Sequence, residues 1–155
     1  MRITEFKAVV DEDNRTKLVK ESARNYIGHD SMNSPQKIAD LMTDMYELDK
    51  QAVEHVYMVA LNSKSKVLGV YMVSKGTVNA TILAPREIYM AALMMGAVNV
   101  VVIHNHPSGD STPSNDDLIS TKRIKDAGSL IGIQLMDHVI IGNNRYHSMK
   151  EAGTL

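Results

Sequence analysis

The sequence predicts an α/β (α+β) domain built around one mixed β-sheet that is flanked by helices. A nearly continuous aliphatic run over Val98–His104 has the composition of a central strand covered on both faces. The alternating segment His55–Asn62 and the return strand Val67–Ser74 predict a hairpin around a short polar turn. Apolar residues recur at three- and four-residue spacing over Pro35–Leu48, which is typical of an amphipathic helix. Helices and strands mixed along one chain favour a single sheet with helices packed on it.

Length and composition limit the class of protein. The chain has 155 residues, 44% hydrophobic and 23% charged, which suits one ordinary globular core. The formal net charge of −1 does not favour binding to nucleic acid or to an anionic membrane. The absence of cysteine excludes disulfides, a cysteine nucleophile and cysteine-ligated zinc. The sequence has neither an apolar signal core nor a run long enough to span a bilayer, so we expect a cytoplasmic protein that binds no membrane.

The first fifty residues are expected to form an N-terminal extension, residues 1–50, of helical and edge-strand character. Arg2–Val10 has the pattern of a short edge strand, and the charge density of Asp13–Tyr26 favours an exposed helix. Ser34 stands where a residue would cap the helix that follows. Because an exposed strand edge could pair two chains, a homodimer is a further expectation.

The later elements are bounded by glycine, proline and asparagine turn residues. In chain order we expect a strand over Thr77–Leu83, a helix from Pro85 to Met95, a helix over Asn115–Ala127, and strands over Ile131–Gly142 and Tyr146–Met149. Gly96 and Gly128 are the expected stops of the two helices, since glycine commonly follows the last helical turn.

Two histidines at the end of the central strand are the strongest chemical signal. His104 and His106 are two residues apart, and side chains alternate across a strand, so both rings point to the same face. Two such imidazoles can supply two corners of a tetrahedral zinc site. The loop from Pro107 to Pro113 then turns the chain so that an acid at the next helix start can face back toward them. Two histidines and one carboxylate would leave the fourth corner open for water, which is typical of catalytic zinc.

The residues alone leave the third ligand open. Asp117 can face the histidines, but Ser114 and Asp117 also have the spacing of a helix capping box. Asp110 and Asp116 are rival carboxylates.

The other histidines carry weaker signals. His138 is expected to be a strand histidine that makes one hydrogen bond, beside Asp137. His29, His55 and His147 are expected to be surface or core residues because each is isolated in the sequence.

Residues from about Gln51 to Glu151 closely resemble the RadC-like JAB/MPN domain, also called the JAMM metalloprotease fold. The most specific match is His-x-His, seven residues, Ser, two residues and Asp, which fits His104, His106, Ser114 and Asp117 without a change in spacing. The matching stretches are residues 61–64, 76–80, 85–87, 104–110, 113–117 and 137–142.

The resemblance implies a role for each motif residue. It makes residues 51–155 a JAB/MPN metalloprotease domain of cytidine-deaminase-like fold, with His104, His106 and Asp117 as Zn²⁺ ligands. Ser114 would donate a hydrogen bond to the tetrahedral oxyanion. Glu54 fits the position of the family's general acid/base, and Glu47 is the nearest rival. The implied activity is zinc-dependent hydrolysis of a peptide or isopeptide bond in a polypeptide substrate.

Two differences from longer relatives limit which functions the resemblance implies for this chain. Full-length RadC proteins have an N-terminal helix-hairpin-helix region, and the first fifty residues here lack its glycine-containing hairpins. Nothing resembles the insertions that recognise ubiquitin in other relatives. A DNA-repair or mobile-element accessory protein that binds nucleic acid without hydrolysis is the alternative function, and the net charge does not favour it.

Overall fold

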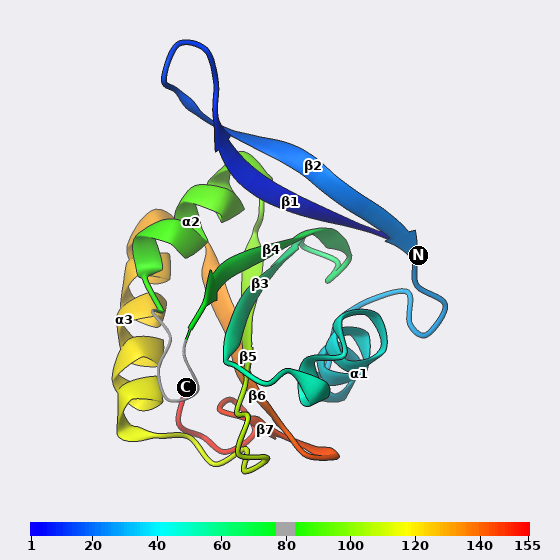
Figure 1. The fold of residues 1–155 in the computed structure, drawn as a ribbon. Helices are drawn as coiled ribbons and strands as arrows, with labels where there is room; N and C mark the ends of the chain where they lie inside the picture. Colours follow the sequence, from blue (N-terminus) through cyan, green and yellow to red (C-terminus); the bar gives the residue numbers. More distant parts are fainter. Residues whose placement is uncertain (77–82) are drawn as a thin grey trace.

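The computed structural model describes residues 1–76 and 83–155, and these form one mixed seven-stranded sheet with helices on both faces (Figure 1). The α+β class predicted from the sequence is confirmed. The strands are β1 (Arg2–Val10), β2 (Thr16–Asn25), β3 (His55–Leu61), β4 (Val67–Lys75), β5 (Asn99–Asn105), β6 (Gln134–Gly142) and β7 (Arg145–Ser148). The helices are α1 (Pro35–Tyr46), the short 3-10 helix η1 (Leu48–Lys50), α2 (Pro85–Met94) and α3 (Asn115–Ile131).

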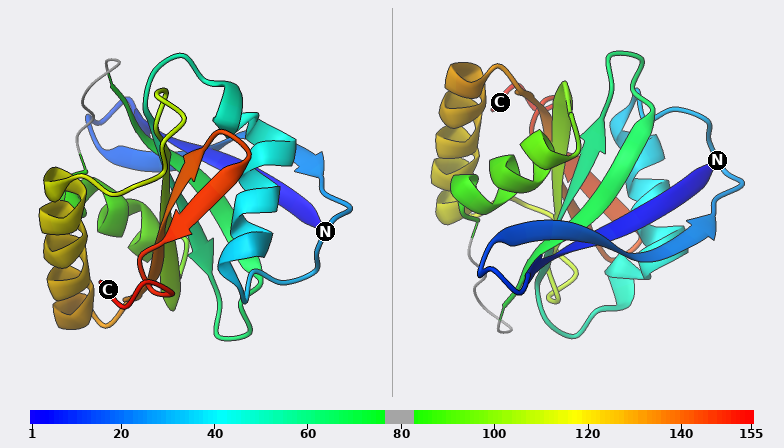
Figure 2. Two further views of the ribbon diagram at one scale, coloured as in Figure 1. Left: turned by 90° about the horizontal axis from the view of Figure 1, so that it is seen from below. Right: turned by 90° about the horizontal axis from the view of Figure 1, so that it is seen from above.

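The strand order is β2-β1-β4-β3-β5-β6-β7, in which β1 and β4 pair in parallel, as do β5 and β6, and the other neighbours are antiparallel. Helix α1 lies on one face of the sheet, and α2 and α3 lie on the other (Figure 1, Figure 2). Both faces of β5 are buried, as predicted: Val101 and Ile103 join the core under α1, whereas Val100 and Val102 join the core under α2 and α3. Strand β3 alternates between the two cores in the same way.

The prediction of an exposed helix over Asp13–Tyr26 is wrong, because this segment contains strand β2, which pairs with β1 along its length. Its charged residues lie on the exposed edge of a sheet, where charge discourages pairing with other strands, and charge density alone does not distinguish such a strand from a surface helix. Strand β1 is also not an edge strand, since Glu5 and Phe6 pair with Val70 and Tyr71 of β4.

Several other boundaries move by one turn or less. Helix α1 ends at Tyr46, and Ser34 occupies its N-cap position without a capping hydrogen bond from its side chain. The expected strand over 77–83 lies outside the described residues apart from its last residue, which is in no strand. None of the helices in the described residues combines the length and apolar composition needed to cross a bilayer.

The predicted end of helix α3 at Gly128 is wrong. Helix α3 continues to Ile131, and Gly132 ends it with a left-handed backbone (φ 86°) and an N–H that donates to the Gly128 carbonyl at 2.8 Å. Gly128 is instead a buried contact point, where an added Cβ would overlap the Tyr89 hydroxyl and the Ile133 carbonyl. The glycine therefore allows α3 to approach α2 closely.

We predict that Gly128→Ala lowers the free energy of unfolding by about 1–3 kcal/mol, because overpacking against a fixed backbone carbonyl outweighs the helix propensity that alanine gains. Urea unfolding followed by circular dichroism measures the change. Ser129→Ala, at the next and exposed position of α3, is the matched control and should be close to neutral. A Gly128→Ala protein as stable as wild type would contradict this account of the helix contact.

Candidate metal centre

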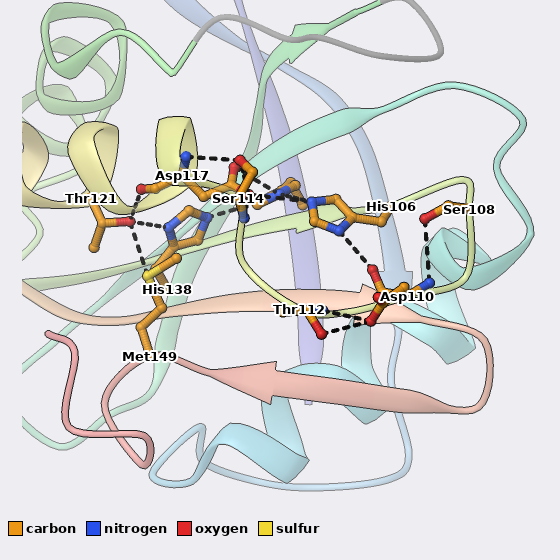
Figure 3. A network of polar contacts seen from close by, with 10 residues as sticks. His106, Ser108, Asp110, Thr112, Ser114, Asp117, Thr121, His138 and Met149 are labelled. Atoms are coloured by element: carbon orange, nitrogen blue, oxygen red, sulfur yellow. Dashed lines mark hydrogen bonds and ion pairs between the residues drawn. The ribbon is translucent and has the colours of Figure 1, made fainter.

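The candidate site lies where β5 ends and α3 begins, on the face of the sheet that α2 and α3 cover (Figure 3). Strand β5, helix α3 and strand β6 form a β-α-β unit whose two strands are parallel. Loops beyond the carboxyl ends of parallel strands are the usual place for ligands in such sheets. The local chain path thus brings a strand end and a helix N-terminus together at one edge.

His104 and His106 point to the same side, as their spacing predicted. The Nε2 atoms of the two rings are 3.0 Å apart, and the ring centroids are 4.9 Å apart. His104 is buried, with 1% of its surface exposed, and His106 is partly buried.

Asp117 completes a triangle with the two imidazoles. Its Oδ1 lies 3.3 Å from His104 Nε2, and its Oδ2 lies 3.4 Å from His106 Nε2. Ligands placed 2.0–2.1 Å from a tetrahedral zinc are separated from each other by about 3.3 Å. The three observed contacts, which use a different Asp117 oxygen for each histidine, are close to that value, so His104, His106 and Asp117 could bind a metal ion.

Asp117 also takes part in the capping box that its spacing with Ser114 suggested. The Asp117 Oδ2 accepts hydrogen bonds from the Ser114 N–H (2.8 Å) and the Ser114 hydroxyl (2.7 Å), and the Ser114 Oγ accepts from the Asp117 N–H (3.1 Å). The helix cap therefore holds Asp117 so that Oδ1 faces His104. The two interpretations of this residue are compatible.

The rival carboxylates are engaged elsewhere. The Asp110 carboxylate accepts from the N–H and the hydroxyl of Thr112, at 3.0 and 2.8 Å. Asp116 lies exposed in the first turn of α3, whereas Asp117 is 8% exposed.

His106 is oriented by the loop that follows it. Its Nδ1 lies 2.7 Å from the backbone carbonyl of Asp110, and because a carbonyl can only accept, Nδ1 carries a proton, so that in the neutral ring Nε2 carries the lone pair. Gly142 lets this loop lie against the end of β6, since an added Cβ there would lie 2.5 Å from the Gly109 carbonyl oxygen. The Asn143 N–H donates to the same carbonyl at 2.9 Å.

Asn105, between the two histidines, points the other way and holds the segment that carries Glu54. Its Oδ1 accepts from the His55 N–H at 2.8 Å, and its Nδ2 donates to the carbonyls of Val53 (3.2 Å) and Gln51 (3.4 Å). This role of Asn105 could not be predicted from the sequence, because the role depends on β3 lying beside β5. Asn105 therefore couples the metal-binding strand end to the residues around Glu54.

The two candidate glutamates differ in their surroundings. Glu54 is partly buried and close enough to His104, His106 and Asp117 for their charges to affect it. Burial raises the pKa of the Glu54 carboxyl above its ordinary value, the two histidines act to lower it, and Asp117 acts to raise it. Glu47 is exposed at the end of α1, on the other side of the sheet, where it pairs with Lys50 at 2.9 Å.

The chain is similar in sequence to a known protein family. A family description of the RadC-like JAB domain matches residues 32–154. The chain belongs to the RadC-like JAB domain family. The resemblance noted from the sequence is thereby confirmed, and all the site residues described above lie within the matched range.

Several UPF0758 proteins are similar to this RadC-like JAB domain. A UPF0758 protein of Desulfitobacterium hafniense is 46% identical over 125 residues, which are 80% of this chain and 54% of that protein. A UPF0758 protein of Clostridium beijerinckii is 44% identical over 125 residues (80% and 53%), and one of Staphylococcus aureus is 45% identical over 123 residues (79% and 53%). The chain spans about half the length of these curated relatives.

The remaining histidines lie outside this ligand group. His138 was expected to make one hydrogen bond but makes two, at 2.8 Å to His104 and at 2.6 Å to Thr121. His29 pairs with Asp40 at 2.8 Å on the other side of the domain, His55 is buried, and His147 is partly buried.

Protonation of the site follows from these contacts. Burial acts to raise the pKa of Asp117, but contacts to His104, His106 and Ser114 outweigh it and hold the pKa far below the ordinary range. The hydrogen bond to Asp117 raises the pKa of His106 above its ordinary value, against the opposing effect of burial. Without a metal ion, His106 therefore takes up a proton more readily than a free imidazole does.

We predict that metal affinity of this JAB domain falls with falling pH, and that the fall begins above the ordinary histidine pKa of about 6.5. The sign follows because the proton binds the metal-free protein at His106 and competes with the ion. The metal affinity therefore has its full value above the raised pKa of His106 and decreases as the pH falls through that pKa. Isothermal titration with Zn²⁺ between pH 5 and pH 8, using about half-unit steps, measures this.

His29→Gln is the control, since it removes an imidazole that pairs with a carboxylate away from the ligands and should leave the pH profile unchanged. An affinity that is constant across this range would contradict a proton competing at His106.

Proposed function

We propose that this RadC-like JAB domain is a zinc-dependent hydrolase of the JAMM type that cleaves a peptide or isopeptide bond. The observation that carries the proposal is the convergence of two imidazole nitrogens, 3.0 Å apart, with the Asp117 carboxylate, whose Oδ1 lies 3.3 Å from His104 Nε2 and whose Oδ2 lies 3.4 Å from His106 Nε2. The triangle offers three ligands and leaves a tetrahedral ion one position for water, as in catalytic zinc sites.

The donor set supports zinc as the ion. Imidazole nitrogen suits zinc, and the mixture of two nitrogens with one oxygen is common among catalytic zinc ligands. Magnesium and calcium favour six or more oxygen ligands, which two imidazoles do not provide. The contacts of 3.0–3.4 Å between these side chains also agree with the spacing of ligands that lie about 2.0–2.1 Å from a zinc ion.

The chain's own residues supply the proton transfers that hydrolysis needs. When bound, zinc supplies Lewis-acid charge and lowers the pKa of a bound water to about 7. Glu54 accepts one proton from the attacking water as the water oxygen bonds to the substrate carbonyl carbon. Glu54 then gives that proton to the amine nitrogen as the carbon–nitrogen bond breaks, so the carboxylate is restored. Its partial burial and raised pKa suit a group that holds a proton between these steps.

Ser114 is proposed to stabilise the oxyanion. Its hydroxyl has one proton, which it donates to Asp117 Oδ2 in this structure, so the hydroxyl must turn toward the substrate oxygen to act. The backbone N–H of Ser114 can keep its own bond to Asp117 while the hydroxyl turns. The helix cap is therefore only partly given up during catalysis.

We propose that the substrate is a polypeptide and that the protein is located in the cytoplasm. The polypeptide follows from the reaction that the site supports, and the lack of cysteine is compatible with a reducing compartment.

We predict that the purified protein holds about one Zn²⁺ per chain, in keeping with a three-residue site. Asp117→Asn and His106→Ala should lose the zinc, because each removes one of three ligands. Inductively coupled plasma mass spectrometry measures the metal content, and Asp116→Asn is the matched control on the next, exposed residue. Wild-type protein that binds no zinc, even after zinc is supplied, would overturn the proposed function.

We predict that Glu54→Gln retains zinc but lowers kcat by about 10²–10⁴-fold, the usual contribution of a general acid/base. Asn105→Ala should also lower kcat with zinc retained, because it frees the segment that carries Glu54. Both are measured on peptide and isopeptide substrate libraries. Glu47→Gln, at an exposed carboxylate, should keep wild-type turnover. Unchanged turnover in Glu54→Gln would exclude this residue as the proton carrier.

A further inference from the structure

We propose that Thr121 and His138 form a hydrogen-bond relay that fixes the tautomer of His104, so that its Nε2 lone pair faces the metal position. The proposal deepens the proposed function, since it rests on His104 being a metal ligand. Thr121 and His138 act as positioning residues, because neither touches the metal position itself. Figure 3 shows both residues beside Asp117.

The relay begins at the backbone of α3. The Thr121 Oγ1 lies 2.6 Å from the Asp117 carbonyl oxygen, one helical turn earlier, and 3.1 Å from the Met149 sulfur. The Asp117 carbonyl cannot donate, so its 2.6 Å contact requires the single hydroxyl proton of Thr121 to be directed to it. The Oγ1 lone pair is therefore left to accept a hydrogen bond.

The donor to that lone pair is His138. Its Nδ1 lies 2.6 Å from Thr121 Oγ1, so Nδ1 carries the ring proton. In a neutral imidazole the other nitrogen is then an acceptor. His138 Nε2 lies 2.8 Å from His104 Nδ1, which must therefore donate to it. His104, Thr121 and His138 are each at most 2% exposed, so water has little access to these nitrogens.

The final step fixes the ligand atom. With the proton on Nδ1, the His104 Nε2 carries a lone pair, and it points toward Asp117 Oδ1 at 3.3 Å. Hydrogen bonds of this kind, from the nitrogen that does not bind metal, orient histidine ligands and set their tautomer. The chain of contacts starts at the Asp117 carbonyl and ends facing the Asp117 carboxylate. Asp117 thus supplies one ligand through its carboxylate, and its backbone carbonyl is the acceptor from which the relay to the second ligand, His104, begins.

The relay makes a prediction that a purely structural polar cluster would not. If Thr121 only fills space and satisfies the backbone, an isosteric valine would change stability and leave the ring protons of His104 where they are. If the relay operates, valine removes the acceptor for His138 Nδ1–H. The His104 form protonated on Nε2 then becomes populated, and the ion must displace that proton to bind.

The test uses the full chain and two measurements. Long-range ¹H–¹⁵N correlation NMR of the metal-free protein reads which nitrogen of each histidine is protonated, and competition titration with a chromogenic chelator measures the Zn²⁺ dissociation constant. The variants are Thr121→Val and Thr121→Ser, which retains the hydroxyl. Ile124→Val, a buried change on the same helix without a polar contact from its side chain, is the control for packing.

In wild type we expect protons on Nδ1 of both His104 and His138. Thr121→Val should populate the Nε2-protonated form of His104 and weaken zinc binding by about 10–100-fold, as second-layer changes at metal sites do. Thr121→Ser should resemble wild type, and Ile124→Val should keep the wild-type tautomers and affinity whatever its stability.

Two results would overturn the relay: Nε2 protonation of His104 in metal-free wild type, which is decisive even if Thr121→Val does not fold, or unchanged tautomers and affinity in Thr121→Val. Wild-type protein that shows the expected tautomers but binds no zinc would overturn the proposed function; the hydrogen-bond relay would stand, but its role in metal binding would not.

Discussion

The site depends on one electrostatic constraint: acceptor atoms from three side chains converge within a few ångströms. His104 Nε2 and His106 Nε2 are 3.0 Å apart, and each has an Asp117 oxygen 3.3–3.4 Å away. Because the other nitrogen of each ring is used as a donor, the facing atoms are lone pairs in the neutral forms. Buried lone pairs without a donor are costly, so the arrangement requires positive charge between them. A metal ion meets this requirement, and a proton on His106, whose pKa is raised, meets part of it.

Strand pairing brings the rest of the site to this triangle. His104 lies opposite Val56 of β3, and Asn105 binds the backbone around Glu54, so the distance from the glutamate to the ligands is set by the register of two neighbouring strands. A slip of one residue would turn every side chain of β3 to the opposite face. Both faces of β3 are buried and alternate between the two cores. The packing that stabilises the sheet therefore also maintains the geometry around the candidate metal site.

The parts of the site that the sequence predicted are those whose geometry is local. Alternation along one strand places His104 and His106 together, and capping geometry within one helical turn places Asp117 beside Ser114. The roles of Asn105 and His138 were missed because each depends on which strand lies next to which, and at what register. Alternation within a strand does not determine that register. The prediction of a helix near the N-terminus was wrong for a related reason, since a charged edge strand and a surface helix have similar compositions.

The N-terminal hairpin contributes to the site through the sheet. Strands β1 and β2 lie before residue 32, where the family match begins, and the candidate site residues lie after it. Strand β1 nevertheless pairs with β4, and β4 pairs with β3 up to His55, next to Glu54. The hairpin moves the open edge of the sheet from β4 to β2, which presents exposed Lys17, Lys20 and Glu21. Charged side chains protect such an edge from adding further strands. Strand β3, which begins directly after Glu54, is thereby separated by the three strands β4, β1 and β2 from any strand that could add at that edge.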